Sequence, residues 1–106
     1  MRQFDVHHYI GAARRTTPYL LVVQSSLFRD YDRRIAVPLV LADVFPRALD
    51  RRLNPMFVID HRSVVLATLD LTSFPLKAFG EWAATLTEHG DDIVAALDLA
   101  MSRAWD

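Results

Sequence analysis

DDIVAALDLAMSRAWD, residues Asp91–Asp106, is the stretch whose pattern most constrains the fold. Its apolar residues recur at the spacing that lines one face of an α-helix: Ile93, Ala96, Leu97, Ala100, Met101, Ala104 and Trp105. Asp91 and Asp92 can cap the first turn, and Gly90 separates the helix from the element before it. An amphipathic helix needs an apolar surface to lie on, so the rest of the chain must supply one.

The residues before this helix supply that surface as short apolar strands. The predicted strands run from Phe4 to near Gly11 and over Tyr19–Val23, Arg33–Leu39, Met56–Ile59, Ser63–Ala67 and Leu69–Phe74. Pro38 places the third of them at an edge of the sheet or ends it there. Asp60-His61-Arg62 between the fourth and fifth indicates a hairpin.

Two further segments complete the predicted order of elements. Asp43–Leu53 combines weak helical spacing with Pro46, which predicts an irregular excursion with a short helical or extended piece. Lys77–Thr87 repeats apolar residues at helical offsets and predicts a short helix or helical turn. Strands followed by helices indicate an α+β fold, an antiparallel and barrel-like sheet with helices on one side.

Length and composition narrow the class of protein. The 106 residues, 52% of them hydrophobic, predict a single domain over residues 1–106 with a genuine core. The absence of cysteine fits a reducing compartment and excludes thiol chemistry and disulfides. Neither a signal peptide nor a transmembrane run is expected, so we expect a cytoplasmic protein without membrane contact. A net charge of −1 argues against autonomous binding to nucleic acid.

No pattern of residues in the sequence indicates a catalytic site. The four histidines lack ligand spacing and the three glycines form no phosphate-binding loop, so neither a metal nor a cofactor is expected. An acid–base ribonuclease needs only converging His, Arg and Asp side chains, for which Arg14, His61 and Asp70 are arbitrary candidates; surface charges are the better interpretation. Leu27-Phe28, beside a charged turn, predicts either a lid over the core or an exposed patch for a partner.

An ordered set of segments across nearly the whole chain resembles the CcdB family of toxins. The segments are Gln3–Val6, Val23–Ser25 with the apolar pair after it, Arg33–Leu39, Asn54–Ile59, Thr68–Pro75 and Asp92-Ile93. The resemblance implies an SH3-like antiparallel β-barrel with a small accessory sheet and a C-terminal α-helix, assembled as a homodimer.

The resemblance also implies a function without covalent chemistry. Family members are the toxins of type II toxin–antitoxin pairs: they bind the A subunit of DNA gyrase and trap its cleaved-DNA complex. A cognate antitoxin neutralises the toxin, and the pair together represses its own operator DNA. The alternatives are a retargeted or non-toxic homologue that acts as an antitoxin-bound co-repressor, and a MazF/Kid-like endoribonuclease.

Five residues are the predicted target-binding set: Leu27, Phe28, Asp98, Met101 and Trp105. The first four match family positions that face gyrase. Family toxins then end in an aromatic residue, a glycine and an aliphatic residue, where this chain has Ser102, Arg103 and Ala104. If the helix continues, Trp105 lies about 4.5 Å further along its axis and about 60° round from the family aromatic, which presents an indole on a similar side.

Overall fold

The computed structural model describes residues 1–45 and 50–101. Among these residues seven strands precede one α-helix: β1 (Asp5–Tyr9), β2 (Tyr19–Val22), β3 (Arg33–Leu41), β4 (Met56–Ile59), β5 (Arg62–Leu66), β6 (Thr72–Pro75), β7 (Phe79–Thr85) and α1 (Gly90–Met101). Single 3-10 turns lie between them: η1 (Ser26–Phe28), η2 (Thr68–Asp70), η3 (Leu76–Ala78) and η4 (Thr87–His89). No helix of the described ranges is long and apolar enough to cross a membrane.

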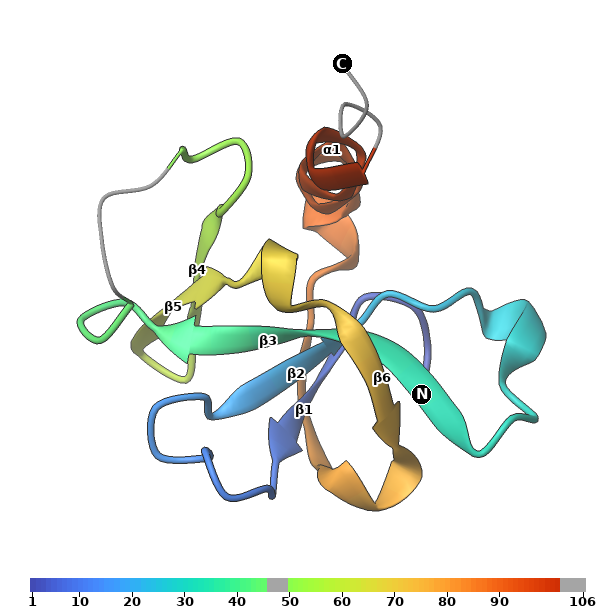
Figure 1. The fold of residues 1–106 in the computed structure, drawn as a ribbon. Coiled ribbons are helices and arrows are strands. Elements are labelled where there is room, and N and C mark those ends of the chain that lie inside the picture. The colour runs from blue at the N-terminus through green and yellow to red at the C-terminus, as the bar shows by residue number, and fades with distance from the viewer. Residues whose placement is uncertain (46–49, 102–106) are drawn as a thin grey trace.

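The strands form one curled antiparallel half-barrel, with α1 at one end of it (Figure 1). The strand order is β4-β5-β3-β2-β1-β7, and β6 also pairs with β3. The predicted α+β class, an antiparallel barrel-like sheet with a C-terminal helix, is confirmed. Strand β6 lies outside this order but belongs to the same sheet. The long strand β3 pairs with β6 over its first half and with β5 over its second.

Pro38 lies inside β3, a strand with neighbours on both sides, so the predicted position at a sheet edge or strand end is wrong. Leu20 of β2 is its partner on one side, and its carbonyl accepts a hydrogen bond from Ala67 N on the other. That side is where the neighbour of β3 changes from β5 to β6. The missing N–H of proline therefore interrupts no ladder, and the sheet continues through it.

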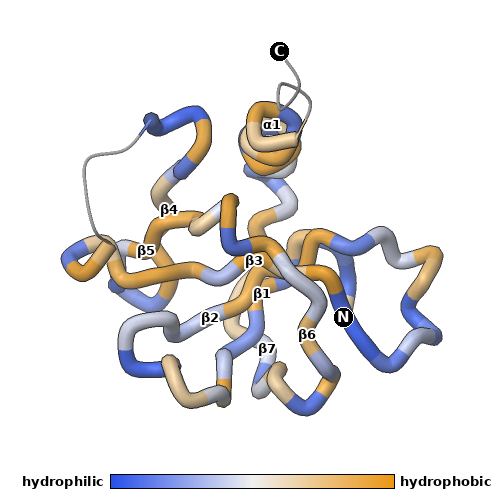
Figure 2. The backbone as a smooth tube through the Cα atoms, viewed as in Figure 1, coloured by the Kyte–Doolittle hydropathy of each residue, from blue (hydrophilic) through white to orange (hydrophobic). Residues whose placement is uncertain are grey.

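The larger of two apolar clusters among the described residues lies between the curled sheet and α1. Figure 2 shows the hydrophobic residues concentrated on the strands and on the helix. Ile93 and Ala96 are fully buried against Val6, Leu21 and Leu39, and Leu97 packs beside them. The first part of the predicted apolar stripe therefore seats α1 on the sheet, whereas Met101 is exposed, and Ala104 and Trp105 lie outside the described residues. The helix begins at Gly90 and not after it.

The predicted helix over Lys77–Thr87 is wrong, because Phe79–Thr85 forms strand β7 along β1. The register between these strands shifts twice, between Val6 and His7 and between His7 and Tyr9. Each irregularity interrupts the alternation of inward and outward side chains. The buried positions Phe79 and Leu86 thus acquire a spacing that imitates a helix, while Trp82 lies exposed.

Of two other segments, one differs from its predicted form and the other, Asp43–Leu53, agrees with it in the residues that the structure describes. Leu69 and Asp70 belong to the turn η2, so the strand predicted from Leu69 begins at Thr72, and it includes Pro75. Asp43–Leu53 is irregular in its described parts, where Leu53 N and Asn54 N both bond Asp50 O. Residues 46–49 of that segment lie outside the described residues.

The predicted hairpin between β4 and β5 is confirmed, and its turn offers a test of backbone strain. Asp60 and His61 have φ angles of 51° and 65°, as a two-residue type I′ turn requires. Since glycine adopts such angles without steric cost, we expect His61→Gly to raise the free energy of unfolding by about 0.5–1 kcal/mol. Ser63→Gly, in the neighbouring strand, should lower it. Urea denaturation measures both, and a less stable His61→Gly would contradict the expectation.

Candidate functional site

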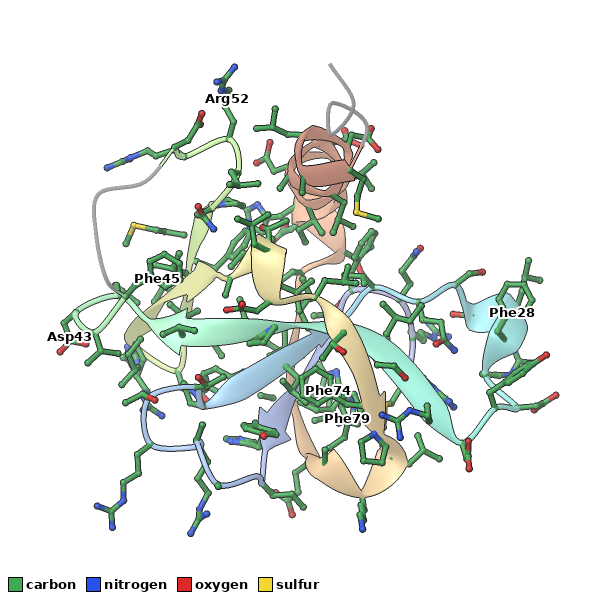
Figure 3. The ribbon with its side chains drawn as sticks, in the orientation of Figure 1. Phe28, Asp43, Phe45, Arg52, Phe74 and Phe79 are labelled. Atoms are coloured by element: carbon green, nitrogen blue, oxygen red, sulfur yellow. The ribbon has the colours of Figure 1, made fainter. Side chains whose placement is uncertain are left out.

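The apolar pair Leu27-Phe28 projects from the loop between β2 and β3. Leu27 is 85% exposed and Phe28 is 53% exposed, and no residue of their turn η1 is buried. Figure 3 shows Phe28 at the edge of the molecule, away from both the sheet and α1. The pair therefore covers no part of the core, and of the two interpretations open from the sequence the structure supports the exposed patch.

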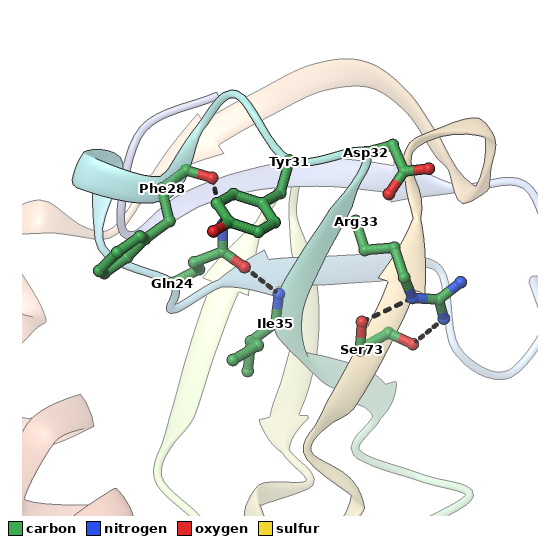
Figure 4. Close-up of a pocket in the computed structure, with 7 residues that line it drawn as sticks. All are labelled: Gln24, Phe28, Tyr31, Asp32, Arg33, Ile35 and Ser73. Carbon is green, nitrogen blue, oxygen red and sulfur yellow. Dashed lines mark hydrogen bonds between the residues drawn. The ribbon is translucent and has the colours of Figure 1, made fainter.

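A groove of about 440 Å³ lies directly beside this pair (Figure 4). Its walls come from the β2–β3 loop, from β3 and from β6: Gln24, Phe28, Tyr31, Asp32, Arg33, Ile35 and Ser73. Phe28 and Tyr31 meet edge to face with ring centroids 6.3 Å apart. Tyr31 and Ile35 are themselves exposed, so the apolar surface continues from the projecting pair into the groove.

Hydrogen bonds hold this surface in one conformation. Gln24 Nε2 donates to Phe28 O at 3.1 Å, and Gln24 Oε1 accepts from Ile35 N at 3.0 Å. Leu27 N donates to Ser25 Oγ at 3.2 Å, which caps η1. On the far wall, Arg33 donates to Ser73 Oγ and to Ser73 O, at 2.7 and 2.6 Å (Figure 4). The loop thus presents its apolar side chains from a bonded frame.

Two of the remaining predicted target-binding residues, Asp98 and Met101, belong to α1. Asp98 and Met101 lie one turn apart, and Met101 is 67% exposed. Trp105 lies outside the described residues. In Figure 1 α1 lies above the sheet, while η1 lies at its side. Within one chain the pair Leu27-Phe28 is therefore apart from the pair Asp98 and Met101.

The three residues considered for a ribonuclease lie on different elements, and all are exposed. Arg14 is in the β1–β2 loop, where its guanidinium donates to Gly11 O at 3.2 Å. His61 is in the hairpin turn, and Asp70 ends η2. Within the described ranges, no group of three or more His, Asp or Glu residues could hold a metal ion.

Sequence reasoning missed two features. The first is the groove, whose residues include Tyr31, Ile35 and Ser73. In the sequence its only sign is Tyr31, an aromatic residue within a charged turn. The other feature is a polar cluster around Tyr19, whose hydroxyl donates to Asp60 Oδ2 at 3.5 Å and whose ring lies 5.9 Å from the Arg62 guanidinium. Burial, aided by the Asp60 charge, raises the pKa of Tyr19. Because Tyr19 is buried, this cluster ties the hairpin to the sheet.

The ordered segments quoted from the sequence agree with one protein family. The model of the CcdB protein family matches residues 3–102. The chain belongs to the CcdB family. CcdB proteins are toxins of toxin–antitoxin systems, and the described pair Leu27-Phe28 falls inside the matched region.

Solved structures similar to this CcdB family member include two endoribonucleases and one toxin, all from mycobacteria. A mycobacterial endoribonuclease, solved with its cognate antitoxin, has a TM-score of 0.70 and 15% identity, over 100% of this chain and 99% of that chain. A second mycobacterial endoribonuclease has a TM-score of 0.71 and 13% identity, over 100% of this chain and 95% of that chain. The Mycobacterium tuberculosis toxin MazF-mt6 has a TM-score of 0.73 and 12% identity, over 95% of this chain and 99% of that chain. At such identities the likeness concerns the fold.

Proposed function

We propose that this CcdB family member binds the A subunit of DNA gyrase and traps the cleaved-DNA complex, acting by binding and without covalent chemistry. The observation that carries the proposal is the exposure of Leu27 and Phe28 on a hydrogen-bonded loop, at the position of the family's apolar pair. Large apolar side chains on a loop with a hydrogen-bonded main chain are effective anchors, because little backbone entropy is lost when a partner covers them.

The proposed assembly is a symmetric homodimer that a cognate antitoxin neutralises in the cytoplasm. A two-fold axis presents the Leu27-Phe28 loop and the tip of α1 twice, which suits a two-fold symmetric target such as gyrase. The solved complex of the mycobacterial endoribonuclease with its antitoxin supports an antitoxin partner for this fold. With a net charge of −1, contact with operator DNA is proposed only through the antitoxin complex.

A supercoiling and cleavage assay with purified gyrase tests the target. We expect linear DNA to accumulate when the toxin is added to gyrase, plasmid and ATP, while an RNA substrate incubated in parallel stays intact. RNA cleavage without linear DNA would replace the proposal by an endoribonuclease. Neither product, together with retained antitoxin binding, would identify a retargeted or non-toxic co-repressor.

Met101→Ala tests the contribution of the helix tip. Because it removes an exposed apolar side chain from the proposed contact set, we expect it to weaken binding to the gyrase A subunit about tenfold. Val94→Ala is the matched control, an exposed apolar residue of the same helix outside that set. Calorimetry measures both affinities, and equal effects would remove Met101 from the target surface. Asp98 and Trp105 stay in the proposed set on their sequence positions.

A further inference from the structure

Arg34 is a buried cation whose guanidinium is bonded to the loop that carries Leu27 and Phe28. It lies on β3 and is only 7% exposed. Its Nη1 donates to Tyr31 O at 2.5 Å and to Arg33 O at 2.7 Å. Its Nη2 donates to the main-chain oxygen of Arg29. All three acceptors belong to one short segment of main chain, residues 29–33.

These carbonyls replace water as the hydrogen-bond acceptors of the buried guanidinium. No carboxylate of residues 1–45 or 50–101 pairs with Arg34, and its Nε is buried without a hydrogen-bond partner among them. Burying a guanidinium is costly unless polar groups replace the lost water. The loop carbonyls are those groups, so a conformation that moves them away while Arg34 stays buried leaves the charge uncompensated.

Arg34 and Gln24 together bind the inner side of the loop. Gln24 holds the carbonyl of Phe28, and Arg34 holds those of Arg29 and Tyr31. With these three carbonyls directed inward, the side chains of Leu27 and Phe28 are left outward and exposed. Two side chains, one from each flank of the loop, thus bond the main chain that carries the exposed apolar pair.

We propose that Arg34 is a positioning residue for partner binding: it contacts no partner and acts by holding the Leu27-Phe28 loop in its binding conformation. The inference rests on the proposed function for the identity of the partner. Arginine suits the role because its planar fork reaches several acceptors at fixed angles, whereas the lysine ammonium is a single point donor. Arg34→Lys is thus expected to rescue only part of the effect of Arg34→Met.

Amide hydrogen exchange tests the loop without any partner. The amides of Leu27, Phe28, Arg29 and Tyr31 are bonded within the loop. We expect Arg34→Met to speed their exchange at least about tenfold, while the amides of β2 keep their protection. Arg33→Met is the matched control, since Arg33 bonds Ser73 on β6 and not the loop. Unchanged loop exchange, or equal loss in β2, would overturn the proposal. If Arg34→Met does not fold, Arg34→Lys decides by the same comparison.

A double-mutant cycle with the gyrase A subunit tests the link to binding. We expect Arg34→Met to weaken binding about tenfold in the wild-type background and much less in the Leu27→Ala background. Equal weakening in both would show that Arg34 does not act through the pair and would overturn the proposal. If the wild-type protein does not bind gyrase, the proposed function fails, and the exchange result alone decides the role of Arg34.

Discussion

Replacing both Leu27 and Phe28 by alanine should abolish the trapping of cleaved DNA by gyrase and leave the fold intact. Truncation of central apolar anchors costs about 2 kcal/mol or more each in protein interfaces, so the pair together corresponds to about a thousandfold loss of affinity. Neither side chain is buried, hence the free energy of unfolding should change by less than about 0.5 kcal/mol. Binding to the gyrase A subunit, DNA linearisation and urea denaturation measure the three quantities.

Val58→Ala is the control for this result. Val58 is 69% exposed on the edge strand β4, which lies on the opposite side of the sheet from η1 in Figure 1. It removes apolar surface of a similar kind without touching the proposed contact set. Equal loss of trapping in the control would point to a general effect of surface hydrophobicity, and full trapping by the double variant would remove the loop from the mechanism.

Truncating Ile93 should produce the largest loss of stability in α1. The side chain is fully buried in the main apolar cluster, where it meets residues of β1, β2 and β3. Ile93→Ala therefore leaves a cavity between helix and sheet, and we expect the free energy of unfolding to fall by about 2–5 kcal/mol. Small domains have only about 5–15 kcal/mol in total, so toxicity should fall with the population of folded protein.

The neighbouring residue Val94 is a matched control for Ile93. It is exposed and next in the same helical turn, so Val94→Ala should change the free energy of unfolding by less than about 0.5 kcal/mol. Urea denaturation followed by circular dichroism measures both variants. A loss below about 1 kcal/mol for Ile93→Ala would mean that the helix is not held by this contact.

Most of the fold was predictable because its strands carry local signals. The apolar run at Tyr19–Val22 is buried along its whole length, and the Asp60-His61 turn joins β4 to β5 as its composition indicates. Prediction failed where a neighbouring strand sets the pattern. The register shifts along β1 give β7 a helix-like spacing, and the change of neighbour opposite Pro38 lets a proline lie within a central strand.

From local residue patterns the candidate site was predictable as a pair of adjacent residues, and the family resemblance added Asp98, Met101 and Trp105. Leu27 and Phe28 stand out as apolar residues beside a charged turn, and the family resemblance implies their role. Arg34 carried no signal, since an arginine in a predicted strand is ordinarily a surface residue. Its burial depends on how the chain returns over it from Arg29 to Arg33, which is a property of the folded loop.

By itself the sequence determined the amphipathic face of the last helix, the hairpin and the apolar pair, because each depends on residues close together in the chain. The helix that opens at Gly90 seats itself through Ile93 and Ala96, as its spacing predicts. Only the tertiary structure decided the groove and the bonding of the loop. Ser73 reaches Arg33 because β6 pairs with β3, and the carbonyls that Arg34 binds converge only once the loop closes over it. Such contacts arise from pairing between distant segments, which no local pattern of residues records.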